Sequence, residues 1–370
     1  MFYCFNVLIL NMKVLFSGGY TLGPVTPLLA IRETIQEKYP EAEFLWVGTK
    51  TGPEKELIEE TDTKFVSITS GKFRRYFSVF NIVDIIKVIV GFFQSIRILW
   101  HENPDMCISA GGFVSVPLHF AAWILGIPTW IHQQDIKIGL SNILMAPLAS
   151  IVTTSVEKNV KHFSQKKTFW LGNPVRQDIL HGDRKKAQEI FHLKPNLPVV
   201  FATGGGTGSA KVNQMVVEAT QHLSGFVQII HLSGKERPQE LVERAKKHFL
   251  DYQVYQFFTK EMKEAYAIAD IVVSRGGFGT LSEIAALGKV AIIIPKPGHQ
   301  EDNVEFLEKN KAAIFVNEIT SSGLQLAKII RDLLVDKEDQ KELATKLQAL
   351  LPVAKKQTII DIVEKLSKKV

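Results

Sequence analysis

Short apolar runs alternate with longer stretches of helical periodicity along most of this chain. In the first half, apolar runs predict β-strands at residues 14–16, 44–47, 65–68, 106–109, 129–132 and 151–154. Between them, apolar residues recur every three or four positions and predict helices, for example over 27–38 and 116–125. Strands that are apolar on both faces and joined by helices predict an open parallel sheet, covered on both sides.

The second half repeats this plan. Strands are predicted at residues 199–202, 228–232, 254–257, 271–274, 290–294 and 313–316. The segment 172–176, Gly-Asn-Pro-Val-Arg, interrupts the alternation. We therefore predict two Rossmann-like, doubly wound α/β domains, 1–171 and 172–370, that face each other across a cleft, with the last helix packing back on the first domain. Ligands of such sheets bind beyond the carboxyl ends of the strands.

Length and composition agree with this plan. The chain has 370 residues, which is long for one domain, and it is 46% hydrophobic and 22% charged, which is ordinary for a globular protein. The net charge of +6 permits a nucleic-acid or anionic-membrane partner, but no block of consecutive basic residues favours nucleic acid. Two cysteines exclude a disulfide framework, and no Cys/His spacing is typical of a metal site. A reducing cytoplasm is expected.

Two apolar segments bear on membranes. Residues 1–11 are mostly apolar but lack a basic leader, and Met12 precedes the first strand like a natural start, so we interpret 1–11 as an upstream extension or a membrane-surface tag. The region 82–100 is interrupted by Asp84, Lys87 and Arg97, and we predict no transmembrane helix there.

The most informative stretch runs from Ser274 to Asn303. A predicted strand ends in a glycine turn, and a helix is predicted to start near Thr280, with Glu283 on its first turn. A helix N-terminus behind glycines offers free N–H groups and a positive dipole end, which suit a diphosphate. A carboxylate beside that site can accept hydrogen bonds from ribose hydroxyls. This stretch therefore predicts a sugar-nucleotide pocket.

Two other glycine-rich turns also follow strands. In the turn 203–210, the amides and the Thr207 hydroxyl could hold a phosphate, although the turn lacks the Gly-Lys-Ser/Thr ending of a P-loop. The alternative is a tight strand-to-helix connection. The turn 18–24 could hold a second phosphate or diphosphate, or be a plain loop.

A polar cluster, His132-Gln133-Gln134-Asp135, ends another strand and is followed by Gly139 and Asn142. It is expected at the cleft, where His132 or Asp135 could serve a reaction. Alternatively, His132 is a core histidine with satisfied ring nitrogens, and Asp135 caps the next helix.

The basic turn Lys72-Phe73-Arg74-Arg75-Tyr76 precedes an amphipathic pattern. Its apolar positions are Ile82, Ile85, Ile86, Ile89, Val90, Phe93 and Ile96. Basic residues beside an apolar face suit an anionic membrane surface. The alternative is a core-facing helix with a solvated charged end.

In order along the chain, these motifs resemble one known family. They are the turn 18–24, Gly111-Gly112-Phe113-Val114-Ser115-Val116-Pro117, His132-Gln133-Gln134 with Gly139-Leu140-Ser141-Asn142, the segment 172–176, Gly204-Gly205-Gly206-Thr207-Gly208-Ser209, Arg275 to Glu283, and His299-Gln300 with Asn303. The family is the MurG-type glycosyltransferases of family 28, and the resemblance runs from about Met12 to the C-terminus. It implies the GT-B fold and metal-independent, inverting transfer of N-acetylglucosamine from UDP-N-acetylglucosamine to a polyprenyl-diphosphate-linked acceptor, lipid I of peptidoglycan synthesis.

The resemblance also implies roles for individual residues. The donor-binding residues would be Arg176, Thr207, Thr259, Phe278, Gly279, Thr280, Leu281, Ser282, Glu283, Gln300 and Asn303. The acceptor or diphosphate loop would include Thr21, Leu22 and Gly23, together with Asn142.

This chain departs from the family pattern on the acceptor side. Pro24 stands where the family has a histidine, Gln133 where it has a glutamate, and Asp135 where it has an asparagine. Inversion needs a base for the acceptor hydroxyl. Asp135 is the leading candidate, His132 the second and His119 a third.

The resemblance further implies a peripheral enzyme at the cytoplasmic face of the cell membrane, with UDP-N-acetylglucosamine, lipid I and an anionic membrane surface as partners. We expect no cofactor, no metal and no nucleic acid. The alternatives are a related GT-B transferase with another lipid acceptor, or a non-catalytic UDP-sugar-binding partner.

Overall fold

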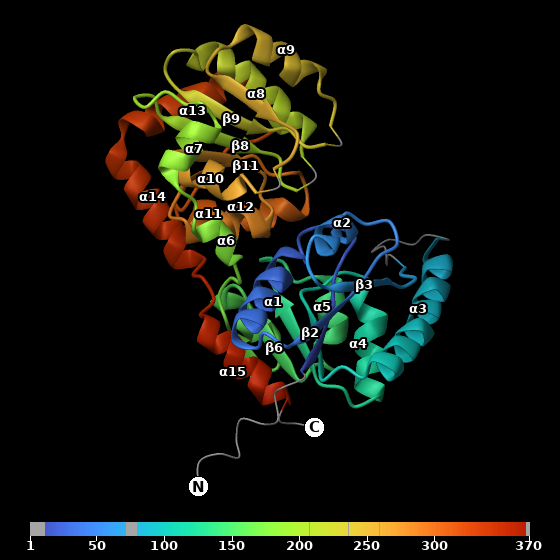
Figure 1. Ribbon diagram of the computed structural model, residues 1–370. Coiled ribbons are helices and arrows are strands. Elements are labelled where there is room, and N and C mark those ends of the chain that lie inside the picture. The colour runs from blue at the N-terminus through green and yellow to red at the C-terminus, as the bar shows by residue number, and fades with distance from the viewer. Residues whose placement is uncertain (1–11, 72–79, 207, 236, 259, 368–370) are drawn as a thin grey trace. The chain divides into compact units, whose positions relative to one another are not determined.

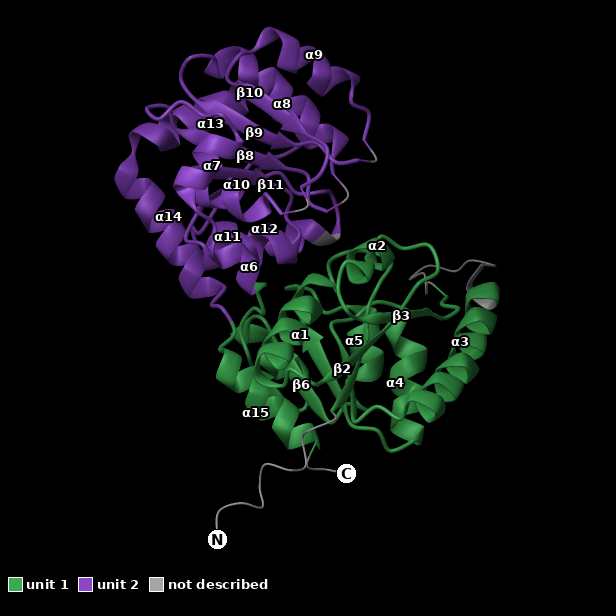
Figure 2. Cartoon of the chain, in the orientation of Figure 1, with its two compact units in different colours: residues 1–176, 354–370 green, residues 177–353 purple. Residues whose placement is uncertain are grey.

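The computed structural model describes residues 12–71, 80–206, 208–235, 237–258 and 260–367 (Figure 1). The chain forms two compact units, one of residues 1–176 with 354–370 and one of residues 177–353 (Figure 2). Each unit contains one parallel β-sheet with helices on both faces. The α/β class with two doubly wound parallel sheets, predicted from the sequence, is confirmed.

Unit 1 has a seven-stranded sheet of order β3-β2-β1-β4-β5-β6-β7. Its strands are β1 Lys13–Ser17, β2 Glu43–Gly48, β3 Lys64–Ser67, β4 Met106–Ser109, β5 Thr129–Gln133, β6 Ile151–Thr154 and β7 Thr168–Trp170. Its helices are α1 Thr26–Lys38, α2 Glu54–Glu59, α3 Phe80–Glu102, α4 Ser115–Ile124, α5 Leu140–Met145, the 3-10 helix η1 Glu157–His162 and α15 Lys356–Ser367. The edge strand β7 was not predicted, because it has only three residues and its apolar run, Phe169 to Leu171, is short.

Alternating side chains of the central strands cover the two faces of this sheet. Val14 and Phe16 of β1 join one buried cluster with residues of α1 and α15, while Leu15 joins another with residues of α3 and α4. This is the two-residue period of a strand that is buried on both faces. Residues of α15 therefore complete the core of unit 1, and Glu364 accepts a hydrogen bond from the Tyr39 hydroxyl at 2.8 Å.

Unit 2 has a six-stranded sheet of order β10-β9-β8-β11-β12-β13. Its strands are β8 Val199–Thr203, β9 Gln228–Leu232, β10 Tyr252–Tyr255, β11 Ile271–Ser274, β12 Val290–Ile293 and β13 Ile314–Phe315. Its helices are α6 Gln177–Leu180, α7 Arg184–Ile190, α8 Ala210–Leu223, α9 Glu240–His248, α10 Met262–Ile268, α11 Phe278–Ala286, α12 His299–Lys309, α13 Gly323–Val335 and α14 Lys337–Leu350.

One edge strand of unit 2 is displaced from its prediction. We expected residues 254–257, but β10 spans Tyr252–Tyr255, and Phe257 beyond it is 41% exposed. Tyr252 and Val254 are the buried positions of this strand. The apolar run therefore continued past the strand end and shifted the prediction by two residues.

Candidate active site

The predicted phosphate turns of unit 2 lie side by side. The turn at 204–209 follows β8 and the turn at 275–277 follows β11, and these strands are paired through Thr203 and Ser274. The strand order also reverses here, since β9 and β10 lie beyond β8, and β12 and β13 lie beyond β11. Both turns therefore sit at the topological switch point, where open α/β sheets bind ligands.

Glycine is required in the first of these turns. Gly205 and Gly208 have φ of +79° and +69°, in the left-handed region. A Cβ on Gly208 would lie 2.6 Å from the carbonyl oxygen of Ser233, in the loop after β9. Ser209 then caps α8 by accepting a hydrogen bond from the Val212 N–H at 3.3 Å. Thr207, the predicted phosphate contact, lies outside the described residues.

The second turn leads directly into α11. This helix begins at Phe278 behind Gly277, two residues before the predicted start at Thr280, so Glu283 lies on the second turn of the helix and the prediction of the first turn was wrong. Gly277 has the extended backbone of an N-cap residue but supplies no side-chain cap. The half-buried Glu283 carboxylate accepts a hydrogen bond from the Tyr266 hydroxyl at 2.9 Å.

The structure separates the predicted donor residues of α11 by burial. Phe278, Leu281 and Ser282 are buried, and the Ser282 hydroxyl donates to the Phe278 carbonyl at 2.8 Å. Gly279 and Thr280 are partly exposed. The buried residues can act through their backbone or by packing, whereas the side chain of Thr280 can reach a ligand.

Helix α12 returns to the same turn. The buried Asn303 amide donates to the Gly276 carbonyl at 3.1 Å. A Cβ on Gly276 would lie 3.2 Å from the Gln300 carbonyl oxygen, and a Cβ on Gly277 would lie 3.8 Å from Gln300 Nε2. Gln300 and Asn303 are thus brought to the glycine turn, as their sequence order alone could not show.

Thr259, a further predicted donor residue, lies outside the described residues. Arg176 is the last residue of the first segment of unit 1.

Unit 1 has a corresponding pair of turns. β1 and β4 are neighbours in the sheet, and the strand order reverses between them. Gly112, in the turn after β4, has φ of +95°, and a Cβ there would lie 3.4 Å from the Gly19 carbonyl oxygen and 4.0 Å from Pro24 Cγ. The loop after β1 therefore lies against the turn after β4, and Pro24 lies at their contact.

The predicted acceptor-loop residues lie on this loop. Thr21 and Gly23 are exposed, and Leu22 is half-buried. The Leu22 carbonyl accepts hydrogen bonds from the N–H groups of Val25 and Thr26 at 3.1 and 3.2 Å. The loop thus leads into α1 with its outer residues available to a ligand.

A buried carboxylate, which the sequence pattern did not single out, holds the base of this loop. Glu54 accepts hydrogen bonds from the Thr49 N–H at 2.7 Å, from the Thr49 hydroxyl, and from the Tyr20 N–H at 3.1 Å. Tyr20 has φ of +71°, and a Cβ on Gly19 would lie 2.2 Å from Glu54 Oε1. In the sequence, Glu54 looks like an ordinary solvent-exposed acidic residue at the start of a helix, and nothing indicates that it is buried.

Asn142 connects the turn after β4 to β5. The hydroxyl of its neighbour Ser141 accepts a hydrogen bond from the Gly112 N–H at 3.2 Å. The Asn142 amide donates to Gln133 Oε1 at 2.7 Å. Its own Oδ1 is buried, has no hydrogen-bond partner among the described residues, and would lie 3.3 Å from a Cβ on Gly111.

The structure separates the three candidate bases. His132 is fully buried, and its ring nitrogens lie 2.9 Å from the hydroxyls of Thr153 and Ser155. Burial lowers the pKa of His132 to about 3 and that of the buried His119 to about 3. Both stay neutral and out of reach of solvent, so the prediction of His132 as a base is not supported, and the alternative of a satisfied core histidine fits. Asp135 is only half-buried.

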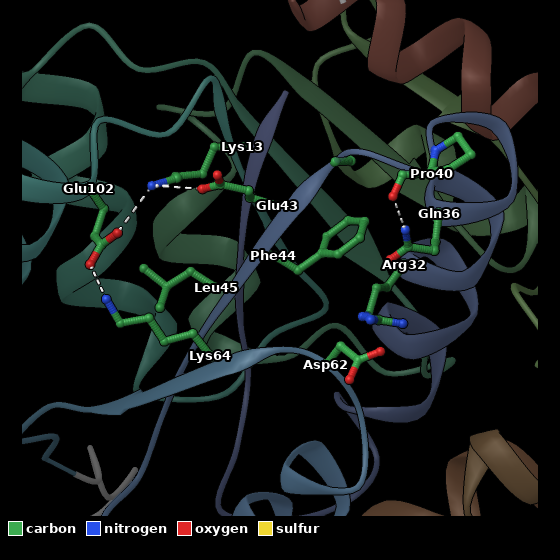
Figure 3. Close-up of a pocket in the computed structure, with 11 residues that line it drawn as sticks. Lys13, Arg32, Gln36, Pro40, Glu43, Phe44, Leu45, Asp62, Lys64 and Glu102 are labelled. Carbon is green, nitrogen blue, oxygen red and sulfur yellow. Dashed lines mark hydrogen bonds and ion pairs between the residues drawn. The ribbon is translucent and has the colours of Figure 1, made fainter. Parts of the chain in front are cut away.

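Unit 1 also contains a cavity of about 690 Å³, none of whose lining residues belongs to these turns. Figure 3 shows the lining residues. Lys13, Glu43 and Lys64 line it at the starts of β1, β2 and β3, which is the amino edge of the sheet. Lys13 Nζ lies 3.1 Å from Glu43 and 3.3 Å from Glu102, and Lys64 Nζ lies 2.6 Å from Glu102. These four charges pair with one another, and Arg32 and Asp62 also line the cavity.

Two domain families match the chain. The glycosyltransferase family 28 N-terminal domain matches residues 14–154, and the glycosyltransferase family 28 C-terminal domain matches residues 199–363. A protein of Clostridium perfringens strain SM101 is 33% identical over 331 residues, 88% of this chain and 91% of that protein. One of Desulforamulus reducens is 32% identical over 367 residues, 96% of this chain and 99% of that protein. Both are named UDP-N-acetylglucosamine–N-acetylmuramyl-(pentapeptide) pyrophosphoryl-undecaprenol N-acetylglucosamine transferase.

Solved structures show the same fold. MurG of Acinetobacter baumannii aligns with a TM-score of 0.72 at 24% identity, over 96% of this chain and 99% of that one. A UDP-GlcNAc 2-epimerase from Neisseria meningitidis, bound to UDP-GlcNAc, aligns with a TM-score of 0.68 at 13% identity, over 96% of this chain and 100% of that one.

Proposed function

The chain belongs to glycosyltransferase family 28, and from this premise we propose that it transfers N-acetylglucosamine from UDP-N-acetylglucosamine to undecaprenyl-diphosphate-linked N-acetylmuramyl-pentapeptide. This is the step from lipid I to lipid II in peptidoglycan synthesis. The single structural observation that carries the proposal is the glycine turn of unit 2, with Asn303 and Gln300 against it and Glu283 on the helix behind it.

The donor site of this proposal lies at the carboxyl edge of the unit 2 sheet. The N-termini of α8 and α11 follow adjacent strands there, and their N–H groups and dipoles stabilise the negative charge that develops on the leaving UDP. Glu283 accepts hydrogen bonds from the ribose hydroxyls, and Gln300 contacts the sugar. Asn303 acts by holding the Gly276 carbonyl in place.

The acceptor and the base are assigned to unit 1. Asp135 takes the proton of the acceptor hydroxyl, whose oxygen forms the new bond to the anomeric carbon while the bond from that carbon to the UDP phosphate oxygen breaks. A half-buried carboxylate suits this role because its side chain is still accessible to an acceptor hydroxyl, unlike the buried His119 and His132. The sequence-predicted domains, 1–171 and 172–370, correspond in this proposal to an acceptor unit and a donor unit.

The membrane surface of the proposal is α3, where most of the predicted apolar positions are exposed. Its buried positions include Asp84, Gly91 and Ser95, while Ile86 is 57% and Phe93 is 64% exposed. The helix packs closely through its small residues, since a Cβ on Gly91 would lie 2.1 Å from the Thr69 carbonyl oxygen. Phe92, Ile96 and Leu99 of the same helix pack on the core of unit 1, so α3 has one core-facing side and one exposed apolar side. An exposed apolar face of this kind suits a membrane.

Helices α4 and α5 add further exposed apolar residues to those of α3. The sequence pattern did not predict that these residues are exposed. α3 packs against α4 and α4 against α5, and Trp123, Ile124 and Ile143 are all at least half exposed. The basic turn 72–76 lies outside the described residues. Among the described helices, none has the length and apolar character needed to span the bilayer. We propose peripheral binding at the cytoplasmic face of the membrane, with no nucleic-acid partner.

A transfer assay tests the proposed function. The full chain is incubated with UDP-N-acetylglucosamine, with and without lipid I, and both lipid-linked product and free UDP are measured. Acceptor-dependent UDP release with formation of the lipid-linked disaccharide is expected. Transfer only to another lipid acceptor would overturn the choice of acceptor. UDP-sugar binding without release of UDP would favour a non-catalytic binding protein.

A further inference from the structure

The last residue of β5, Gln133, joins three parts of the acceptor unit through one buried side chain. Its Nε2 donates to the carbonyl of Asp135 at 2.7 Å and to that of Lys137 at 3.3 Å. Its Oε1 accepts from the Asn142 amide at 2.7 Å. One amide thereby connects the strand end, the following turn and α5.

The two backbone carbonyls fix the orientation of this amide. A carbonyl oxygen only accepts hydrogen bonds, so the nitrogen of Gln133 must face Asp135 and Lys137. A glutamate at this position could still accept from Asn142, but its carboxylate would oppose both carbonyls inside the protein. In this chain the turn therefore binds an amide at position 133, where the family pattern has a glutamate.

These contacts fix both polar groups that the proposed reaction uses in unit 1. The Asp135 carbonyl accepts a second hydrogen bond, from the Asn159 amide at 3.0 Å, so its peptide is held from β5 and from η1. The Asn142 amide is directed to Gln133 Oε1 and to the His132 carbonyl at 3.3 Å, which turns its Oδ1 toward Gly111.

We propose that Gln133 is a positioning residue, whose amide sets the backbone that carries Asp135 and the orientation of Asn142 for transfer to the acceptor. The proposal rests on the proposed function. The titratable side chains nearest to Gln133 along the chain are those of His132, Asp135 and the exposed Lys137. Both ring nitrogens of His132 are hydrogen-bonded to buried hydroxyls.

The test compares Gln133→Glu with Gln133→Met and with a matched control in unit 2. Gln228 is also buried and donates to two backbone carbonyls, those of Lys194 at 2.9 Å and Leu197 at 3.2 Å, at the start of β9 and away from the candidate site. Gln228→Glu therefore creates the same chemical conflict without touching the acceptor side. For each full-length variant, kcat and the KM for UDP-N-acetylglucosamine are measured from pH 6 to pH 8 and normalised to folded protein.

At pH 8, Gln133→Glu is expected to lower kcat at least about tenfold, because small displacements of a catalytic group are costly. The KM for the donor should stay within about twofold, since the donor contacts are assigned to unit 2. The defect should shrink toward pH 6, where a protonated carboxyl can again donate to a carbonyl, whereas the defect of Gln133→Met should not. Gln228→Glu should lower stability but leave kcat unchanged.

Two results would overturn the inference. One is a Gln133→Glu variant that equals the parent at pH 8. The other is a loss of kcat that Gln228→Glu shares, which would mark a purely structural effect. If the parent itself transfers nothing, the proposed function fails, and hydrogen exchange of residues 134–142 decides the inference separately. Faster exchange in Gln133→Glu at pH 8 that reverts at pH 6 supports it, and unchanged exchange refutes it.

Discussion

The two units place glycine turns at the same point of their sheets but secure them with different chemistry. In unit 2, the neutral amide of Asn303 holds the Gly276 carbonyl. In unit 1, the buried carboxylate of Glu54 holds the Tyr20 N–H, and Asp135 follows β5 along the same edge. The neutral Asn303 amide adds no negative charge beside the diphosphate of the proposed donor, whereas Glu54 adds one at the turn of unit 1. This difference agrees with the proposed division, in which unit 2 stabilises charge and unit 1 removes the proton.

Removing the proposed base gives the largest expected effect. Asp135→Asn keeps the size of the side chain but cannot accept the acceptor proton, so turnover should fall by about 10²–10⁴-fold. UDP binding, measured by calorimetry, should stay within a few-fold because the nucleotide site is assigned to unit 2. Near-normal turnover in this variant would exclude Asp135 as the base. A parent that binds UDP-sugar but never turns over would instead indicate a non-catalytic protein.

The sequence predicted unit 2 more fully than unit 1 for a physical reason. The glycine turn, Thr280 and Glu283 lie within a few residues of one another, so local pattern and chemistry coincide. Even there, the helix start was misplaced, because Gly277 and Gly279 gave no side-chain cap from which to locate it.

In unit 1, the decisive contacts join residues that are far apart in the sequence. Glu54 reaches Tyr20 across 34 residues, and Ser141 reaches Gly112 across 29. Nothing local marks them. The burial of His132 likewise depends on Thr153 and Ser155 of the neighbouring strand and loop, so a histidine at a strand end could not be distinguished from a catalytic one.

The donor side is tested by Glu283→Ala. The substitution removes the proposed acceptor of the ribose hydroxyl hydrogen bonds and should weaken UDP binding by about 1.5–3 kcal/mol, typical of hydrogen bonds to a charged group. Calorimetric titration with UDP measures this directly. Glu305→Ala is a suitable control, because Glu305 lies on α12 of the same unit and pairs with Lys309. Equal affinity of the parent and Glu283→Ala would refute the ribose contact.

Each unit contains a buried histidine whose replacement should change the free energy of unfolding, and the two changes should have opposite signs. The ring nitrogens of His231 in unit 2 lie 2.7 Å from the Tyr252 hydroxyl and 3.0 Å from Asn213 Oδ1. Neither ring nitrogen of the buried His119 in unit 1 has a hydrogen-bond partner among the described residues. His119→Leu should therefore raise the free energy of unfolding at pH 7 by about 1–3 kcal/mol, by removing an unsatisfied polar group. His231→Leu should lower it.

Burial of His119 also makes the free energy of unfolding depend on pH in a defined direction. Burial lowers the pKa of His119 to about 3, below its value of about 6.5 in the unfolded chain. The unfolded chain therefore binds a proton at His119 more tightly than the folded chain does. The free energy of unfolding decreases as the pH falls below 6.5, by about 2 kcal/mol at pH 5. Urea unfolding at pH 7 and pH 5 should show a smaller loss in His119→Leu than in the parent. An identical loss would mean that His119 is not buried as described.

The smallest expected effect concerns the membrane face. Phe93→Ser removes one exposed apolar side chain from α3 and should weaken binding to anionic vesicles by about 1–2 kcal/mol, a partial burial of one aromatic ring. Leu250→Ser in unit 2 is the control, since Leu250 is 96% exposed and lies outside the proposed membrane face.

Replacing Lys72, Arg74 and Arg75 with glutamate tests the basic segment that precedes α3 in the sequence, where each cation should contribute about 1 kcal/mol at low salt. This contribution should decline with increasing salt, because ions screen surface charges, whereas the loss in Phe93→Ser should persist. Co-sedimentation with anionic vesicles at two salt concentrations separates the electrostatic contribution of the basic residues from the apolar contribution of Phe93. If neither set of substitutions changes binding while Leu250→Ser does, the membrane face belongs to unit 2, and the assignment of the lipid-linked acceptor to unit 1 loses its physical support.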